Sequence, residues 1–249
     1  YKILNKFKLK YYFANLISPA FRGLKTSIGC RILMYHSLGV IVDGDLNGLY
    51  KMSNNSFQEQ MGYLANLKRP IVPLSEWSTN PEAIVITFDD GFLDTLEIAA
   101  PILVKHNMPF SVFVSPNLIK SKDKRYLKKA SLLELSNIDG CTIGAHGNSH
   151  CELTKCSNKE LINEIQSSKK WLEDKLSKNV NTMSYPHGAV DQRVRDAIDD
   201  AGYTIAVSSR NGANQHESDP LWLSRTDIWS CDNLATFNSK LNGDWDWLI

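Results

Sequence analysis

Short apolar segments alternate with amphipathic segments along most of the 249-residue chain. Runs of β-branched and aromatic residues indicate buried strands, whereas apolar residues spaced three or four positions apart indicate helices. Helix starts are indicated by the Ser157/Glu160 capping-box pattern and by Asp191 and Asp232. The pattern predicts strands at 31–36, 83–88, 110–114, 141–145, 181–185, 203–207 and 221–225, and helices at 57–67, 93–107, 128–136, 157–178, 191–201 and 232–242. Residues 115–126 read as an exposed loop.

This alternation of strands and helices predicts parallel strands joined by right-handed crossovers. About seven strands in this length favour an α/β fold, a deformed (β/α) barrel with about seven parallel strands, over an open sheet. We expect residues 31–249 to form this barrel. Residues 1–30 form a basic and aromatic N-terminal extension, packed either on the barrel or on a membrane surface.

Composition narrows the functional classes. A hydrophobic content of 43% is typical of a globular protein, and a net charge of +1 argues against nucleic acid as a partner. No segment has the length and apolarity of a transmembrane helix. The five cysteines show no framework spacing, and Cys151 and Cys156 lack the C-x-x-C spacing of a structural zinc site. These features favour a cytoplasmic location, with membrane association and export as alternatives.

Four polar residues follow two of the predicted strands. Asp89 and Asp90 come directly after 83–88, while His146 and His150 follow 141–145. Either pattern alone is weak, since Asp-Asp-Gly often forms a turn. Two adjacent carboxylates in a pocket need a nearby cation, however, and neutral imidazoles complete the ligand set of a catalytic zinc site. Because functional residues of barrels lie at strand ends, the combination favours a metal site.

These segments carry a family resemblance. TFDDGF at 87–92, HGNSH at 146–150 and YPHG at 185–188 occur in an order that resembles the polysaccharide deacetylases, carbohydrate esterases related to chitin, peptidoglycan and nodulation-factor deacetylases. ILMYHSLG at 32–39 resembles the first strand of bacterial surface-polysaccharide deacetylases. The resemblance spans about residues 31–240. It implies a metal-dependent hydrolase that removes N-acetyl groups from a sugar in a surface polysaccharide, glycan or precursor.

The resemblance also implies residue roles. Asp89 would be the general base, and Asp90, His146 and His150 would hold a divalent metal, zinc first, with cobalt, nickel and manganese as alternatives. The backbone N–H of His187 would stabilise the oxyanion. One departure from the family pattern is Gly147, where serine or threonine is usual, and a contact from Ser149 could compensate.

Two further departures concern the catalytic groups. Ser184 stands where the family has an arginine beside the base, and we expect Arg225 to replace it; the alternative is a surface ion pair between Arg225 and Asp227. The family's late L-x-H motif is missing, so we expect His36 or His187 to be the general acid, unless Asp89 itself returns the proton.

Candidates for sugar binding are Tyr185, Trp229 and Asp227, because they lie near the ends of predicted strands. Aromatic faces such as those of Tyr185 and Trp229 stack on sugars. Two other functions compete with deacetylation of an N-acetylated carbohydrate. One is a catalytically weak or inactive barrel that binds glycan, and the other is an amidase acting on a non-sugar amide. The pattern makes no prediction about the oligomeric state.

Overall fold

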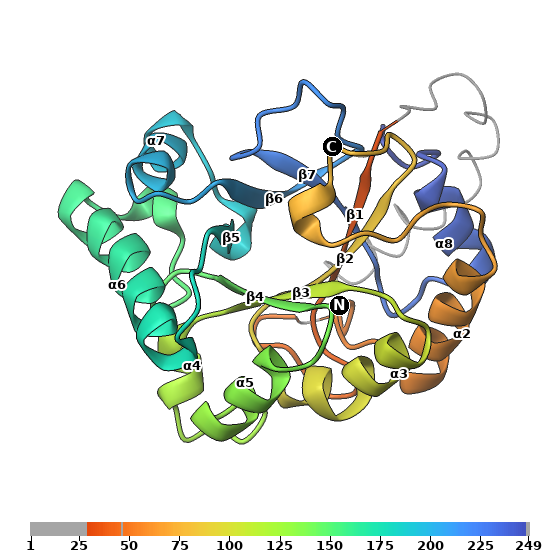
Figure 1. The fold of residues 1–249 in the computed structure, drawn as a ribbon, viewed down its shortest axis with the longest axis horizontal. Coiled ribbons are helices and arrows are strands. Elements are labelled where there is room, and N and C mark those ends of the chain that lie inside the picture. The colour runs from red at the N-terminus through yellow and green to blue at the C-terminus, as the bar shows by residue number, and fades with distance from the viewer. Residues whose placement is uncertain (1–28, 46, 248–249) are drawn as a thin grey trace.

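The computed structural model describes residues 29–45 and 47–247. Seven parallel strands form a closed barrel in chain order, with the last strand pairing with the first (Figure 1). The predicted (β/α) barrel of about seven parallel strands is confirmed. The strands are β1 (Arg31–Tyr35), β2 (Ile84–Phe88), β3 (Phe110–Val114), β4 (Cys141–Ala145), β5 (Thr182–Ser184), β6 (Ile205–Asn211) and β7 (Leu223–Asp227).

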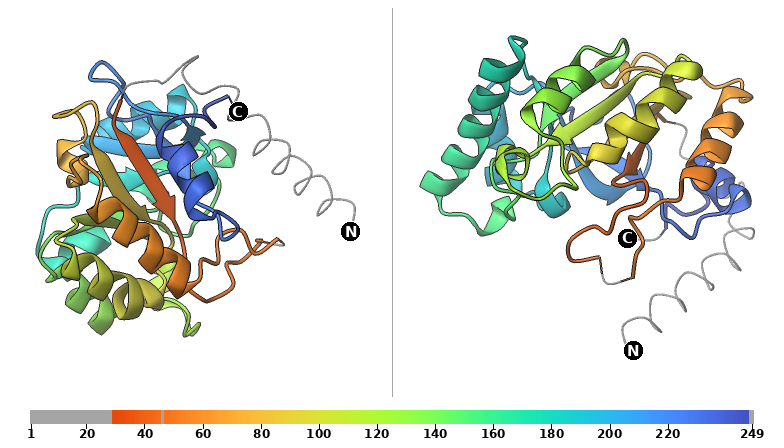
Figure 2. Two further views of the ribbon diagram at one scale, coloured as in Figure 1. Left: turned by 90° about the vertical axis from the view of Figure 1, so that its right-hand side faces the viewer. Right: turned by 90° about the horizontal axis from the view of Figure 1, so that it is seen from below.

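Helices pack around the outside of the barrel. Figure 1 shows α6 and α7 together on one side and α2 and α8 on the opposite side, and both pairs are in contact. The loop after β1 projects from one end of the barrel (Figure 2). The helices are α2 (Asn54–Ala65), α3 (Ala100–Lys105), α4 (Pro116–Lys120), α5 (Lys129–Ser136), α6 (Asn158–Leu176), α7 (Gln192–Asp200) and α8 (Leu234–Leu241).

Two predicted segments differ from the structure. The helix expected over 93–107 is divided into a π-helical turn, Thr95–Ala99, and α3. Pro101 explains the division, because it has no N–H with which to continue an α-helical hydrogen-bond ladder. The loop expected over 115–126 contains α4, in which Pro116 occupies the first turn, a position that proline tolerates.

Side-chain caps fix the helix starts. Ser157 Oγ accepts from the Glu160 N–H at 3.4 Å, and Glu160 Oε2 accepts from the Ser157 N–H at 2.9 Å, so the predicted capping box is present. Asp191 caps α7 as predicted, through its bond to the Val194 N–H. The cap of α8 is Asn233 instead of Asp232, because Asp232 forms an ion pair with Lys240 at 2.6 Å.

Strand alternation separates two apolar clusters. One lies inside the barrel, and the other lies between the strands and the surrounding helices. The inner cluster includes Ile32, Val85, Phe113, Val207 and Leu223. The outer cluster includes Leu33, Ile86, Val112, Ala206, and Phe57 and Leu172 from helices. A residue that continues the inner series just past a strand end therefore faces the inside of the barrel, as long as the backbone stays extended.

No helix within the described part of the chain is both long and apolar enough to cross a membrane. The predicted N-terminal extension, with its proposed membrane contact, lies outside the described residues except for positions 29 and 30. The division of the chain at residue 30 therefore stays a prediction.

Candidate active site

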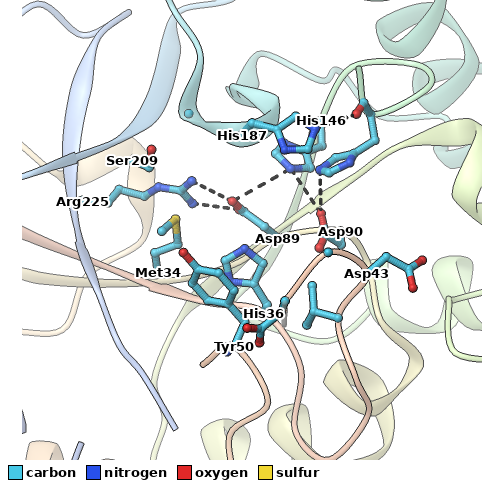
Figure 3. A pocket seen from close by; sticks show the side chains of 15 residues that line it. Met34, His36, Asp43, Tyr50, Asp89, Asp90, His146, His187, Ser209 and Arg225 are labelled. Carbon is cyan, nitrogen blue, oxygen red and sulfur yellow. Dashed lines mark hydrogen bonds and ion pairs between the residues drawn. The ribbon is translucent and has the colours of Figure 1, made fainter. Parts of the chain in front are cut away.

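Polar residues in or just after five strands meet at the carboxyl end of the barrel. They surround a cavity of about 330 Å³, shown in Figure 3. Alternation brings in His36, two residues beyond Met34, and Asp89, two residues beyond Thr87. Asp90 and His187 do not follow the alternation, and both have left-handed backbone at the point where the chain turns after its strand. The strand-end residues lining the cavity are His36 after β1, Asp89 and Asp90 after β2, His146 and His150 after β4, His187 after β5, and Arg225 in β7.

Asp90, His146 and His150 form a compact set of ligand atoms. Asp90 Oδ1 lies 3.4 Å from His146 Nε2 and 3.1 Å from His150 Nε2. One ligand atom from each of the three residues lies within 4.8 Å of the others. The three residues predicted from the sequence to be metal ligands therefore lie together in the structure.

The polar surroundings of this set fit a divalent cation. His146 Nδ1 lies 2.8 Å from the carbonyl oxygen of Ser184, so Nδ1 carries the proton and Nε2 is left as an electron-pair donor. Asp90 Oδ1 is buried and makes no hydrogen bond to another described residue. A buried carboxylate oxygen is costly without a partner, and a cation between it and the two imidazoles would supply one.

Asp89 is paired with Arg225, as expected from the sequence. The guanidinium donates from Nη1 to Asp89 Oδ1 at 2.8 Å and from Nη2 to Oδ2 at 2.7 Å. Arg225 is only 1% exposed, so the alternative of a surface ion pair with Asp227 is wrong. Burial raises the pKa of Asp89, but the charges of Arg225 and His146 outweigh it and hold that pKa at about 2. Asp89 is therefore a carboxylate at neutral pH.

Ser184 connects the base to the metal-ligand set. Its hydroxyl accepts from Arg225 Nη2 at 2.9 Å and donates to Asp89 Oδ2 at 3.1 Å. Its carbonyl oxygen is the acceptor for His146 Nδ1. The small side chain leaves room for the guanidinium of Arg225, which also donates from Nε to the Ser208 carbonyl at 2.7 Å. The guanidinium is thus fixed by groups in or just after three other strands, β2, β5 and β6.

Left-handed backbone is concentrated at this site. Five described residues other than glycine have positive φ, and three of them are Asp90, His150 and His187, at 71°, 62° and 57°. Such residues cost about 1 kcal/mol or more each, and they persist where the surroundings fix them. The strained backbone orients both His150 and Asp90 within the ligand set.

Two glycines permit the close packing of the site loops. Gly147 has φ +65°, and a Cβ there would lie 3.2 Å from Pro186 Cγ, which accounts for glycine where the family usually has serine or threonine. Gly188 has φ +66°, and a Cβ there would overlap the Ser209 hydroxyl at 1.7 Å. A side chain at Gly147 would therefore press on the loop that carries His150, and one at Gly188 would clash with Ser209 beside His187.

The carboxylate of Glu164 holds the loop between the two histidines. Its Oε2 accepts from the N–H groups of Asn148 and Ser149, both at 2.8 Å, and its Oε1 accepts from Ser149 Oγ at 2.7 Å. The compensating contact expected from Ser149 is therefore made to Glu164. Sequence analysis missed this residue. The available signal was a carboxylate within the apolar stripe of α6, at helical spacing between Leu161 and Ser168.

The loop after β1 forms one wall of the cavity, and its residues were not predicted from the sequence either. Val42, Asp43, Asp45 and Tyr50 line the cavity. Arg125 fixes this wall, because its guanidinium donates to both oxygens of Asp43 at 2.9 Å. The only sequence signal was the position of the loop at a strand end, since its residues form no motif.

The two candidate acids occupy different sides of the site. Figure 3 shows His36 and Tyr50 on one side of Asp89, with His146 and His187 on the other. The ring of His36 lies 4.2 Å from that of Tyr50, and its Nδ1 is buried without a hydrogen-bond partner among the described residues. His187 is exposed, and its Nε2 lies 3.2 Å from the His150 carbonyl oxygen.

None of the three residues predicted to contact sugar lines the cavity. Tyr185 is fully buried, and its hydroxyl donates to the Leu221 carbonyl at 2.5 Å, since it follows Ser184 and so faces the outer layer. Trp229 packs on Lys240, whose Nζ lies 3.8 Å from its ring centroid. Asp227 is the register partner of Met34, and burial raises its pKa although the charge of His36 opposes the rise.

Comparison with known proteins is consistent with this geometry. A family model described as polysaccharide deacetylase matches residues 77–206. The Bacillus subtilis protein YxkH is 25% identical over 79% of this chain and 70% of its own. The poly-beta-1,6-N-acetyl-D-glucosamine N-deacetylase of Staphylococcus aureus is 23% identical over 71% of this chain and 67% of its own. The Streptococcus pyogenes deacetylase PplD, solved with acetate, shares the fold with a TM-score of 0.76, 20% identity, and coverage of 86% and 98%.

Proposed function

Because this chain belongs to the polysaccharide deacetylase family, we propose that it is a metal-dependent hydrolase that removes N-acetyl groups from a sugar of a surface polysaccharide or its precursor. One observation carries the proposal: a carboxylate held ionised by Arg225 lies beside three ligand atoms within 4.8 Å of one another. A glycan-binding module would have no need for a base beside a metal-ligand set.

The chain's own residues account for the proton transfers. When bound at Asp90, His146 and His150, a divalent ion such as zinc would supply positive charge that acidifies water and polarises the acetyl carbonyl. Asp89 is the proposed general base, accepting the proton of the attacking water while Arg225 and the Ser184 hydroxyl hold both of its oxygens. The backbone N–H of His187 is the proposed donor to the oxyanion.

We propose His36 as the general acid that protonates the departing sugar amine. Asp227 is the register partner of Met34, two residues before His36, so both side chains continue the inner series of adjacent strands. Each carries a buried atom without a hydrogen-bond partner among the described residues, Nδ1 in His36 and Oδ1 in Asp227. His36 itself lines the cavity, so its ring can reach a leaving group bound there. His187 is a weaker candidate, because the His150 carbonyl engages its Nε2.

Acetate release tests the proposal. β-1,4- and β-1,6-linked N-acetylglucosamine oligomers are compared with simple acetamides, using the zinc-loaded protein and its Asp89→Asn variant as the matched control. The proposal predicts acetate from at least one oligomer, release slower by about two to four orders of magnitude from the variant, and little acetate from the acetamides. Oligomer binding without acetate would identify a glycan-binding barrel, and equal turnover of acetamides would identify an amidase.

A further inference from the structure

Two thiols lie in contact beside the metal-ligand set. Cys151 directly follows His150, and its Sγ lies 3.4 Å from Sγ of Cys156. All five cysteines of the chain lie within the described residues, and none forms a disulfide. This pair has no part in the proposed deacetylation.

Both thiols are open to small reagents. Cys151 and Cys156 are half-buried and line a surface hollow of about 460 Å³, together with Ser149 and Glu164. Cys30, in contrast, is only 1% exposed, so a reagent in solution cannot reach its thiol. Cys151 and Cys156 are therefore both accessible to a reagent and close enough to each other to react.

We propose that Cys151 and Cys156 are a modification site at which a small-molecule disulfide, such as glutathione disulfide, forms an intramolecular disulfide. One thiolate attacks the reagent and releases one glutathione thiolate, and the second cysteine then displaces the other glutathione from the mixed disulfide. The two cysteines lose two electrons and two protons, and the reagent is reduced to two glutathione thiols. A bond of about 2.05 Å requires the sulfur atoms to approach by only about 1.4 Å.

The bond would restrain the segment that carries His150. In the reduced protein, the left-handed His150 is held by noncovalent contacts: its carbonyl oxygen lies 3.2 Å from His187 Nε2, and Ser149 binds Glu164. A disulfide beginning at the next residue adds a covalent restraint. The oxidised form should therefore lose bound zinc to a chelator more slowly than the reduced form, because a ligand held in place rebinds before the ion escapes.

Thiol counting tests the modification directly, with no dependence on deacetylase activity. Reduced protein is equilibrated with glutathione disulfide, and thiols are counted after denaturation. We expect the count to fall from five to three, the intact mass to fall by two hydrogen atoms, and one peptide pair to link Cys151 with Cys156. The Cys156→Ser variant should not form this link, whereas Cys231→Ser, which removes an exposed cysteine elsewhere, should form it normally.

Two further measurements test proximity and restraint. Phenylarsine oxide, which bridges two neighbouring thiols, should bind the reduced protein at one equivalent and protect both cysteines, and it should not bind Cys156→Ser in this way. Closing a six-residue loop should raise the Tm of the metal-free protein by about 4–8 °C. Five thiols remaining after oxidation, or a link between other cysteines, would overturn the proposal. Unchanged Tm and unchanged zinc release in the oxidised form would overturn the restraint on His150.

Discussion

Replacing Arg225 with methionine should shift the acidic limb of the pH–rate profile to higher pH. The change keeps an unbranched side chain in a fully buried position but removes both hydrogen bonds to Asp89 and the neutralising charge. Opposite charges about 4 Å apart attract by about 4 kcal/mol at an effective dielectric constant of about 20, which corresponds to about 3 pKa units. Since the pKa of Asp89 is held at about 2, it should rise to about 5 in the variant.

The assay is the pH dependence of kcat/KM for acetate release, with metal content measured at every pH. Below about pH 5, the variant should lose about tenfold in kcat/KM per pH unit, because the base becomes protonated. At pH 7 its carboxyl is still almost fully ionised. A large loss at pH 7 would therefore report a displaced Asp89 and not a protonated one.

Two variants separate this effect from general destabilisation. Arg31→Met removes another fully buried arginine, which binds Asp246 at 2.6 Å at a distance from the cavity, and it should leave the limb where it is in the parent. Combining Asp89→Asn with Arg225→Met should restore part of the stability lost in the single arginine variant, because no uncompensated charge stays buried. An unmoved acidic limb in metal-loaded Arg225→Met would refute the proposed role of Arg225.

Two other changes test separate parts of the site, and a third tests a buried carboxyl group, Asp94, which accepts from the Leu38 N–H at 2.8 Å. Asp89→Asn should reduce the rate by about two to four orders of magnitude with metal retained, and near-normal turnover would exclude Asp89 as the base. Glu164→Ala should weaken zinc affinity by about 10–100-fold by releasing the loop before His150; unchanged affinity in a competition titration would contradict that support. Asp94, whose pKa burial raises to about 6, binds its proton more tightly in the native than in the unfolded state, so stability should fall by about 2 kcal/mol as pH rises from about 4 to about 6. Asp94→Asn should remove this fall in urea denaturation at the two pH values, and a parallel fall in both proteins would contradict the assignment.

The positions of residues at strand ends explain why most of the site could be predicted from the sequence. Parallel strands bring their carboxyl ends to one rim, so Asp89, Asp90, His146 and Arg225 could be placed together without knowledge of their contacts. The replacement of the family arginine by Arg225 was predictable for the same reason: β7 and β2 both end at that rim, and a guanidinium there reaches across the barrel to the base.

Two kinds of feature could not be predicted from the sequence. One is the face of a short strand on which a side chain lies, and the other is a contact made by a residue from a distant segment. Tyr185 was misassigned because β5 is only three residues long, so its alternation could not be read with certainty, and Ser184 took the inward position instead. Glu164 reaches the site from a helix, and Asp43 depends on Arg125 more than eighty residues away. Such long-range pairings leave no periodic pattern in a single sequence.

Acetate release during a zinc titration tests the central claim most directly. Metal-stripped protein is titrated with zinc while acetate is measured from an N-acetylglucosamine oligomer, with His150→Ala as the variant that lacks one proposed ligand. We predict that activity rises in proportion to added zinc and stops rising at one equivalent, and that His150→Ala neither holds that zinc nor releases acetate. Full acetate release by the metal-free protein, or full zinc occupancy and activity in His150→Ala, would contradict the account.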